Sequence, residues 1–223
     1  MTALVLDQSH PRYAEAFALI SDAYAETINV APTDRPPTLI ALTHQDMIVG
    51  ACGVKMRNGE KPFQTELYCT PATGALLAAY DAIGTLAPSD IAEACSFGVP
   101  KENRSFCPEL AAHVIVYLHQ QGVQAMLMTQ AITVKRILSK IPVAATDICK
   151  ADLQYYAAPD EEIRAWNERY FRVARPHCSV LNVAEAATAS LEYLRTLHTA
   201  PLVLYSGGVE TAKATATGHA VAA

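Results

Sequence analysis

The chain has 223 residues, of which 51% are hydrophobic and 17% are charged, so global disorder is excluded and a sizeable core is expected. A formal net charge of −5 argues against nucleic-acid binding, which needs a basic surface. The apolar runs are too short for a membrane span, and the N-terminus lacks the features of a secretory signal. We therefore expect a cytoplasmic protein without a membrane span, whose six cysteines are reduced thiols.

Residues 1–70 predict a strand, a helix and then an antiparallel meander. Apolar residues recur at helical spacing in the helix, and Asn58-Gly59 is typical of a tight hairpin turn. The last segment alternates polar and apolar residues, as a half-buried strand does. The predicted elements are a strand at 2–6, a helix at 12–28, strands at 38–43 and 47–56, and a strand at 62–69.

The remaining residues predict strands and helices in alternation. A helix lies between two strand-like segments, which favours a parallel pair with a crossover, and Gly122 ends that helix. This order predicts a single α/β domain over 1–200, with a mixed sheet and helices on both faces, and a flexible tail over 201–223. The elements are a helix or long connection at 72–87, strands at 90–99, 123–128, within 141–153 and at 173–183, and helices at 108–122, 130–140, 160–171 and 185–199.

Glu93 interrupts the apolar strand at 90–99. An unpaired buried carboxylate is costly, so this one must be paired, protonated or functional. Its functional interpretation is a general base that accepts a proton from an amine attacking a thioester. The alternative is a solvent-facing carboxylate, or one paired with an arginine. Glu66 is a second strand carboxylate that would help to bind the amine, or else a solvated side chain of an alternating strand.

The polar loop at 100–107 precedes a helix that Pro108 is suited to start. Amides at a helix N-terminus bind phosphate, and nearby cations add to the attraction. The candidate phosphate ligands are Lys101, Asn103, Arg104 and Ser105, and backbone amides near Val99 are candidates to polarise a thioester carbonyl. The alternative is an ordinary strand-to-helix connection.

Other residues are assigned by pattern alone. Lys135, Arg136, Lys140 and Lys150 either extend a basic edge for an acidic carrier or form a solvated helix face. The cysteines and histidines show no zinc-ligand spacing, so we expect no metal, and no partner activates a cysteine nucleophile. Trp166, Tyr170 and Phe171 are either a packing cluster or one wall of an acyl pocket, with Tyr170 on the acceptor side.

From about Thr38 to Val183 the chain resembles the thermostable-hemolysin-type family of GNAT-like acyltransferases, which is related to the acyl-homoserine-lactone synthases. The resemblance is carried by PPTLIAL, MIVGACGVK, TELYC, DIAEACSFGV, VQAMLMTQAITVKRILSKIPV and AWNERYFRVARPHCSVLNV. It implies a sheet splayed between its fourth and fifth strands, with a pantetheine arm in the gap and Glu93 at the site. The loop lacks the glycines of the family's Q/R-x-x-G-x-G/A pattern, which leaves an acyl-carrier protein open as the donor beside acyl-CoA.

The resemblance implies transfer of an acyl group from acyl-CoA or an acyl-carrier protein to the amine of a small molecule such as an amino acid. The alternative is a non-catalytic GNAT-like binding module, which the missing loop glycines favour. A membrane-active hemolysin rests on the family name alone, because the sequence shows no amphipathic membrane hairpin. An exposed edge strand or the late aromatic helix is a candidate interface for a homodimer.

Overall fold

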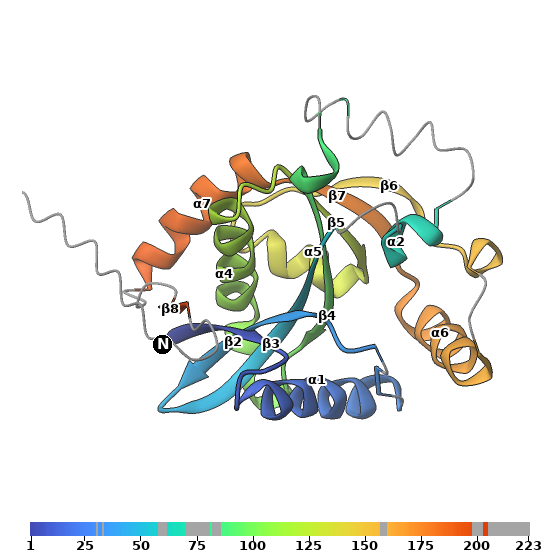
Figure 1. The fold of residues 1–223 in the computed structure, drawn as a ribbon, viewed down its shortest axis with the longest axis horizontal. Coiled ribbons are helices and arrows are strands. Elements are labelled where there is room, and N and C mark those ends of the chain that lie inside the picture. Colours follow the sequence, from blue (N-terminus) through green and yellow to red (C-terminus); the bar gives the residue numbers. More distant parts are fainter. Residues whose placement is uncertain are drawn as a thin grey trace, which may run out of the picture.

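The structure is a computed structural model that describes residues 1–29, 31–32, 34–57, 62–69, 81, 86–156, 160–197 and 203–204. Its strands form one mixed sheet in the order β6-β7-β5-β4-β3-β2-β1-β8 (Figure 1). The strands are β1 (Thr2–Asp7), β2 (Thr38–His44), β3 (Met47–Met56), β4 (Ile91–Gly98), β5 (Ala125–Gln130), β6 (Thr146–Lys150), β7 (His177–Asn182) and β8 (Val203–Leu204). The α-helices are α1 (Tyr13–Ile28), α2 (Gln64–Leu67), α4 (Cys107–Gln120), α5 (Ile132–Leu138), α6 (Glu161–Ala174) and α7 (Val183–Thr196), and the 3-10 turns are η1 (Pro88–Asp90), η2 (Lys101–Phe106) and η3 (Leu153–Tyr155).

The predicted mixed sheet with helices on both faces is confirmed. Alternate residues of β1 to β3 point to opposite faces, because successive side chains of a strand alternate. One set packs under α1, around Ile20 and Leu39, and the other packs under α4 and α7, around Ile40 and Ile115. In Figure 1, α1 lies on one side of the sheet, and α4 and α7 lie on the other.

The predicted parallel pair is also confirmed. Strands β4 and β5 run parallel, from the pair Ile91–Ala125 to the pair Ala94–Met128, and α4 crosses between them. Gly122 follows α4 with a φ of 79°, a left-handed conformation that glycine adopts without steric cost. All other neighbouring strands are antiparallel, except that β8 pairs parallel to β1.

The strand predicted at 62–69 is wrong, because this segment forms the short helix α2. Strands β3 and β4 pair directly, with Lys55 opposite Glu93, so no strand fits between them. Glu66 accepts a hydrogen bond from the Phe63 amide (2.6 Å) and so caps its own helix. The segment has the pattern of a strand because its buried residues alternate with a polar one. Phe63 is buried in the core and Thr65 is buried against Glu93, and Gln64 lies between them.

Three further predictions fall wholly or mainly on residues outside the described part of the chain. These are the Asn58-Gly59 turn, the segment at 72–87, and the tail at 201–223. Within that tail, only β8 is described.

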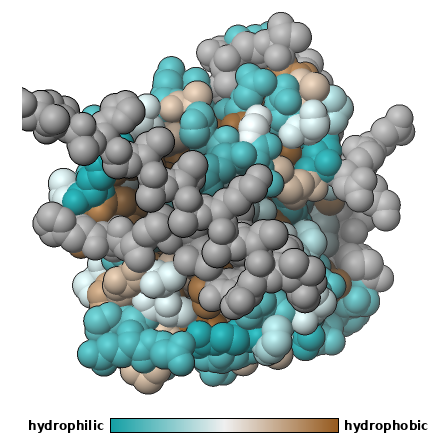
Figure 2. Space-filling view, turned by 60° about the vertical axis from the view of Figure 1, so that its left-hand side comes forward, coloured by the Kyte–Doolittle hydropathy of each residue, from teal (hydrophilic) through white to brown (hydrophobic). Residues whose placement is uncertain are grey.

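No helix among the described residues is long and apolar enough to cross a lipid bilayer. On the face shown in Figure 2, apolar side chains form small patches among hydrophilic ones. Large apolar side chains that remain exposed include Met47, Ile132 and Val173, which lie on three different elements. Scattered apolar residues of this kind are normal on a protein surface.

The packing of α1 on β4 gives a test of the fold. A Cβ atom on Gly98 would lie 2.6 Å from the Ile20 Cα atom, so an added methyl group would push the helix backbone off the sheet. We expect Gly98→Ala to lower the free energy of unfolding by roughly 1–3 kcal/mol, the usual range for overpacking, in a urea titration. The matched control is Gly122→Asn, since a Cβ there meets no atom within 4 Å and asparagine tolerates a positive φ. Equal losses in both variants would contradict the close α1–β4 packing.

Candidate active site

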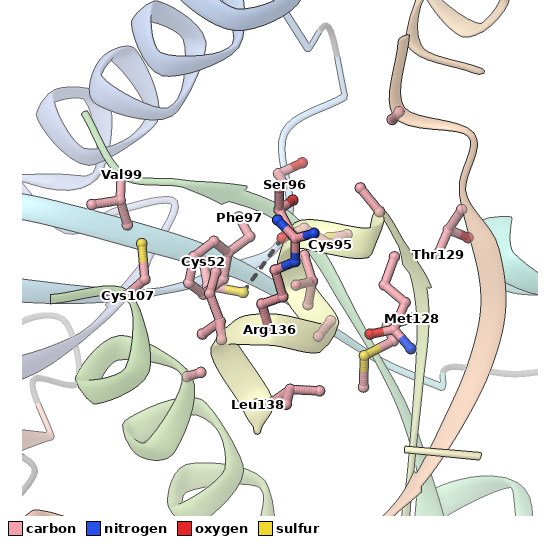
Figure 3. A pocket seen from close by; sticks show the side chains of 18 of the residues that line it. Cys52, Cys95, Ser96, Phe97, Val99, Cys107, Met128, Thr129, Arg136 and Leu138 are labelled. Atoms are coloured by element: carbon pink, nitrogen blue, oxygen red, sulfur yellow. Dashed lines mark hydrogen bonds between the residues drawn. The ribbon is translucent and has the colours of Figure 1, made fainter. Parts of the chain in front are cut away.

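The sheet opens between β4 and β5. The two strands pair only as far as Ala94 and Met128, whereas on its other edge β5 pairs with β7 along its whole length. A cavity of about 540 Å³ occupies this opening, and the last residues of both strands line it. In Figure 3, Cys95, Ser96 and Phe97 of β4 and the following Val99 lie on one side of the cavity, and Met128 and Thr129 lie on the other. The expected splay between the fourth and fifth strands is therefore present.

A bulge shapes the β4 side of the cavity. The register with β3 shifts between Ala51 and Gly53, and Ser96 has a φ of 49°. Because residues past Ala94 have no partner on β5, their backbone faces the opening. A β-bulge next to an active site commonly re-aims the backbone in this way. Val99, the residue predicted to mark the carbonyl-polarising amides, lines the cavity just after this bulge.

Three cationic side chains line the same cavity. Arg104 comes from η2, and Arg136 and Lys140 come from α5 and the residues just after it. None of the three has an acidic partner within 4.0 Å among the described residues. Figure 3 shows Arg136 extending into the cavity toward β4. Unpaired cations at the rim of an apolar cavity fit an anionic ligand.

The remaining candidate phosphate ligands lie outside this cavity. Lys101, Asn103 and Ser105 are on η2, and of that turn only Arg104 is among the lining residues. The turn leads directly into α4, and the Cys107 amide donates to the Arg104 carbonyl oxygen. That amide is therefore not free for a phosphate. Their assignment to phosphate binding remains a prediction.

Glu93 is buried, with 2% of its surface exposed. Its Oε1 atom accepts two hydrogen bonds from Thr65, one from the backbone amide and one from the hydroxyl, both at 2.7 Å. Burial raises the pKa of the carboxyl above its ordinary value, although the charge of Lys55 and the bonds from Thr65 oppose this rise. Among the described residues no arginine forms an ion pair with Glu93, so the arginine-paired alternative finds no support there.

Glu93 does not line the cavity, but a chain of hydroxyl groups joins it to the cavity wall. The Thr65 hydroxyl that bonds Glu93 also lies 2.9 Å from the Thr129 hydroxyl, and Thr129 lines the cavity. Each hydroxyl can donate one hydrogen bond and accept others. A proton released at Thr129 therefore has a continuous path to the buried carboxylate.

Glu66 lies away from this path. Its Oε2 atom pairs with Arg57 at 2.7 Å, and both side chains are mostly buried. Because Glu66 belongs to α2 rather than to a strand beside β4, its predicted position next to Glu93 on a neighbouring strand is wrong. Its neighbour Thr65 makes the contact with Glu93 instead.

An aromatic wall closes the cavity where α1 meets α6. Tyr24 and Tyr170 both line it, and Trp166 stacks on Tyr170 with ring centroids 5.2 Å apart. The Tyr170 hydroxyl donates to the Thr129 carbonyl oxygen at 3.3 Å. Burial raises the pKa of both tyrosines, so both hydroxyls keep their protons at neutral pH. The predicted position of Tyr170 at the pocket is consistent with this geometry.

Three cysteines also line the cavity, and none is activated. Burial raises the pKa of the Cys52 thiol to about 12, and it raises the pKa values of Cys95 and Cys107 as well. A nucleophilic cysteine needs a lowered pKa. These thiols act as small apolar wall groups. No sequence spacing places Tyr24, Thr129 and these thiols at one site, because they come from separate elements.

The fold and the cavity define a GNAT-like α/β protein, with a mixed sheet that opens between its central parallel strands. The sequence matches the family model described as thermostable hemolysin over residues 6–188, and the chain belongs to that family. A comparison with curated proteins gives no match.

Solved structures with a similar fold include acyl-homoserine lactone synthases. The CoA-dependent synthase BjaI with MTA matches with a TM-score of 0.56 at 12% identity, over 94% of each chain. The CoA-dependent synthase MesI gives 0.50 at 13% identity, over 92% of this chain and 100% of that one. The AHL synthase LasI gives 0.50 at 11% identity, over 81% and 89%. At these identities the likeness establishes the fold.

The raised pKa of Glu93 predicts a pH dependence of stability. A carboxyl with a higher pKa in the folded chain binds more protons there, so its contribution to the free energy of unfolding falls as pH rises from about 4.3 through the folded pKa. Glu93→Gln removes this fall. We expect the stability of the variant relative to the wild type to increase between pH 4.5 and 8, measured by urea unfolding. A difference that stays constant with pH would contradict the raised pKa.

Proposed function

We propose that this protein transfers an acyl group from a thioester, carried by coenzyme A or an acyl-carrier protein, to the amine of a small molecule such as an amino acid. The observation that carries the proposal is the cavity in the opened sheet, with a bulged strand on one wall and unpaired cations at its rim. The solved structures of similar fold include CoA-dependent acyl-homoserine lactone synthases, which supports the same class of chemistry. We place the reaction in the cytoplasm.

The donor would lie with its pantetheine arm between β4 and β5. Arg104, Arg136 and Lys140 would bind its phosphates, since a guanidinium or ammonium group forms strong charge-assisted hydrogen bonds to phosphate. The thioester carbonyl oxygen would accept a hydrogen bond from a backbone amide near Val99, which stabilises the negative charge that develops there. The apolar part of the lining, including Met126, Met128 and Ile115, would hold the acyl chain.

The acceptor amine would attack the thioester carbon from the side of Thr129. The new C–N bond forms, the C–S bond breaks, and the carrier leaves as a thiolate. The amine proton passes to the Thr129 hydroxyl, which gives its own proton to Thr65, and Thr65 passes one to Glu93. Tyr24 or Tyr170, both protonated and at the cavity, would stabilise the departing thiolate by hydrogen bonding. The thiolate takes up a proton from solvent as it leaves, and Glu93 returns its proton to solvent through the same hydroxyl groups.

The test of this mechanism is release of free thiol from acyl-CoA and from acyl-carrier proteins, with a panel of amino acids as acceptors. Glu93→Gln keeps the size of the side chain but removes the base, so we expect the rate to fall by roughly 100-fold or more. Thr129→Val breaks the hydroxyl chain and should reduce the rate in the same direction, whereas Thr146→Val on the exposed face of β6 should not. Binding of thioesters without thiol release in the wild type would favour the non-catalytic binding module.

The role of the cations predicts an effect on donor binding alone. We expect the double variant Arg104→Gln, Arg136→Gln to bind acyl-CoA at least about 10-fold more weakly in a calorimetric titration, since each charge-assisted hydrogen bond contributes roughly 1.5–3 kcal/mol. Arg164→Gln, which removes a charge from the exposed surface of α6, is the matched control. Equal affinity in the double variant and the control would remove the phosphate-binding role of this rim.

A further inference from the structure

Three cysteines that are far apart in the sequence meet near the C-terminal end of α2. Cys69 follows α2, Cys149 lies on β6, and Cys178 lies on β7. Their sulfur atoms all lie within 4.8 Å of one another, and the sulfurs of Cys69 and Cys149 are 3.4 Å apart. None of the three is joined in a disulfide. The cluster is separate from the cavity, whose lining thiols are Cys52, Cys95 and Cys107.

The spacing of these sulfurs matches a metal centre. Two thiolates on one zinc ion, each at about 2.3 Å, stand about 3.8 Å apart in tetrahedral geometry. The Cys69–Cys149 pair, at 3.4 Å, would have to open by a few tenths of an ångström, and a pair at the 4.8 Å limit would have to close by about 1 Å. Two of the three ligands are fixed by the sheet, because Cys149 and Cys178 are register partners on antiparallel strands. Ligands held on strands make a more precise site than ligands on loops.

The surroundings limit access of solvent to the cluster. Apolar and aromatic side chains enclose it, including Tyr68, Tyr156 and Phe171. Thiolate is the form that binds metals, so binding of an ion would release the thiol protons.

We propose that Cys69, Cys149 and Cys178 form a three-thiolate site for a thiophilic metal ion, Zn(II) or Cu(I). Soft sulfur ligands select these two ions over harder cations. The described residues supply no fourth His, Cys, Asp or Glu ligand to the group, so Zn(II) would complete its shell with water, whereas Cu(I) needs no further ligand. The proposal stands on this geometry and does not depend on the acyl-transfer reaction.

An ion at this site would brace the segment that holds Glu93. The thiols of Cys69 and Cys178 both donate to the Thr65 carbonyl oxygen, at 3.5 and 3.4 Å. The amide and hydroxyl of the same Thr65 bond Glu93. As thiolate ligands, Cys69 and Cys178 would give up these two S–H···O bonds, and the bond from Cys69 to the ion would tie the end of α2 to β6 and β7 in their place.

The test uses the full-length protein, reduced and stripped of metal under nitrogen. Zn(II) is titrated against a chromophoric chelator, and Cu(I) against bathocuproine disulfonate, so that the two ions are distinguished. We expect one equivalent of one ion to bind and to raise the melting temperature, because a ligand that binds only the folded state stabilises it. We expect Cys69→Ser and Cys149→Ser to weaken binding at least about 10-fold, the least that loss of a metal-supporting group costs. Cys107→Ser, a cavity thiol, should bind as the wild type does.

A second measurement covers the case in which a variant fails to fold. Alkylation of the wild-type protein with and without metal, followed by mass spectrometry, reports which thiols the ion protects. Protection of Cys69, Cys149 and Cys178 alone supports the site. Protection of the cavity thiols instead would overturn the proposal. Absence of stoichiometric metal binding to the reduced protein would overturn it as well.

Discussion

The separation of β4 from β5 is the feature on which the rest of the site depends. Two parallel strands that stay paired use their facing backbone amides and carbonyl groups in hydrogen bonds to each other. Here the pairing stops at Ala94 and Met128, just before the β4 backbone leaves regular strand geometry at Ser96, while β5 stays paired with β7 to its end. The opening exposes backbone and side chains from both strands to one cavity. Helices from both faces of the sheet then close it, which explains why its wall draws on so many elements.

The same opening sets the electrostatics of the site. The cavity lining is largely apolar, and burial raises the pKa values of its tyrosines and cysteines, so these groups stay neutral. The charged groups at the cavity are therefore the three cations, and Glu93 lies behind its wall. Glu93 is not exposed to the cavity, and its anionic form is supported by Thr65 and Lys55 rather than by water. The Thr65 and Thr129 hydroxyls connect this carboxyl to the cavity. In the proposed reaction Glu93 would act as a base that is shielded from solvent.

Much of the fold follows from local sequence pattern, whereas much of the site does not. Periodicity predicted most elements and the parallel crossover, and Gly122 marked the end of α4. The error at 62–69 arose because a four-residue helix with alternating buried positions has the pattern of a strand, and only the direct β3–β4 pairing rules it out. Glu93 was recognisable as unusual because a carboxylate interrupts an apolar strand. The positions of Thr65, Thr129 and Tyr24 near it or at the cavity were not predictable, because they depend on contacts between elements that no sequence spacing records.

We propose that the opening between β4 and β5 binds an acyl-thioester carrier. The measurement to make is a crystal structure of the protein soaked with a non-hydrolysable acyl-CoA. We expect the pantetheine arm to lie between the two strands, with the acyl carbonyl oxygen near the Val99 amide and the coenzyme phosphates near Arg104, Arg136 and Lys140. A ligand bound elsewhere, with the cavity occupied by solvent at saturating concentration, would contradict it.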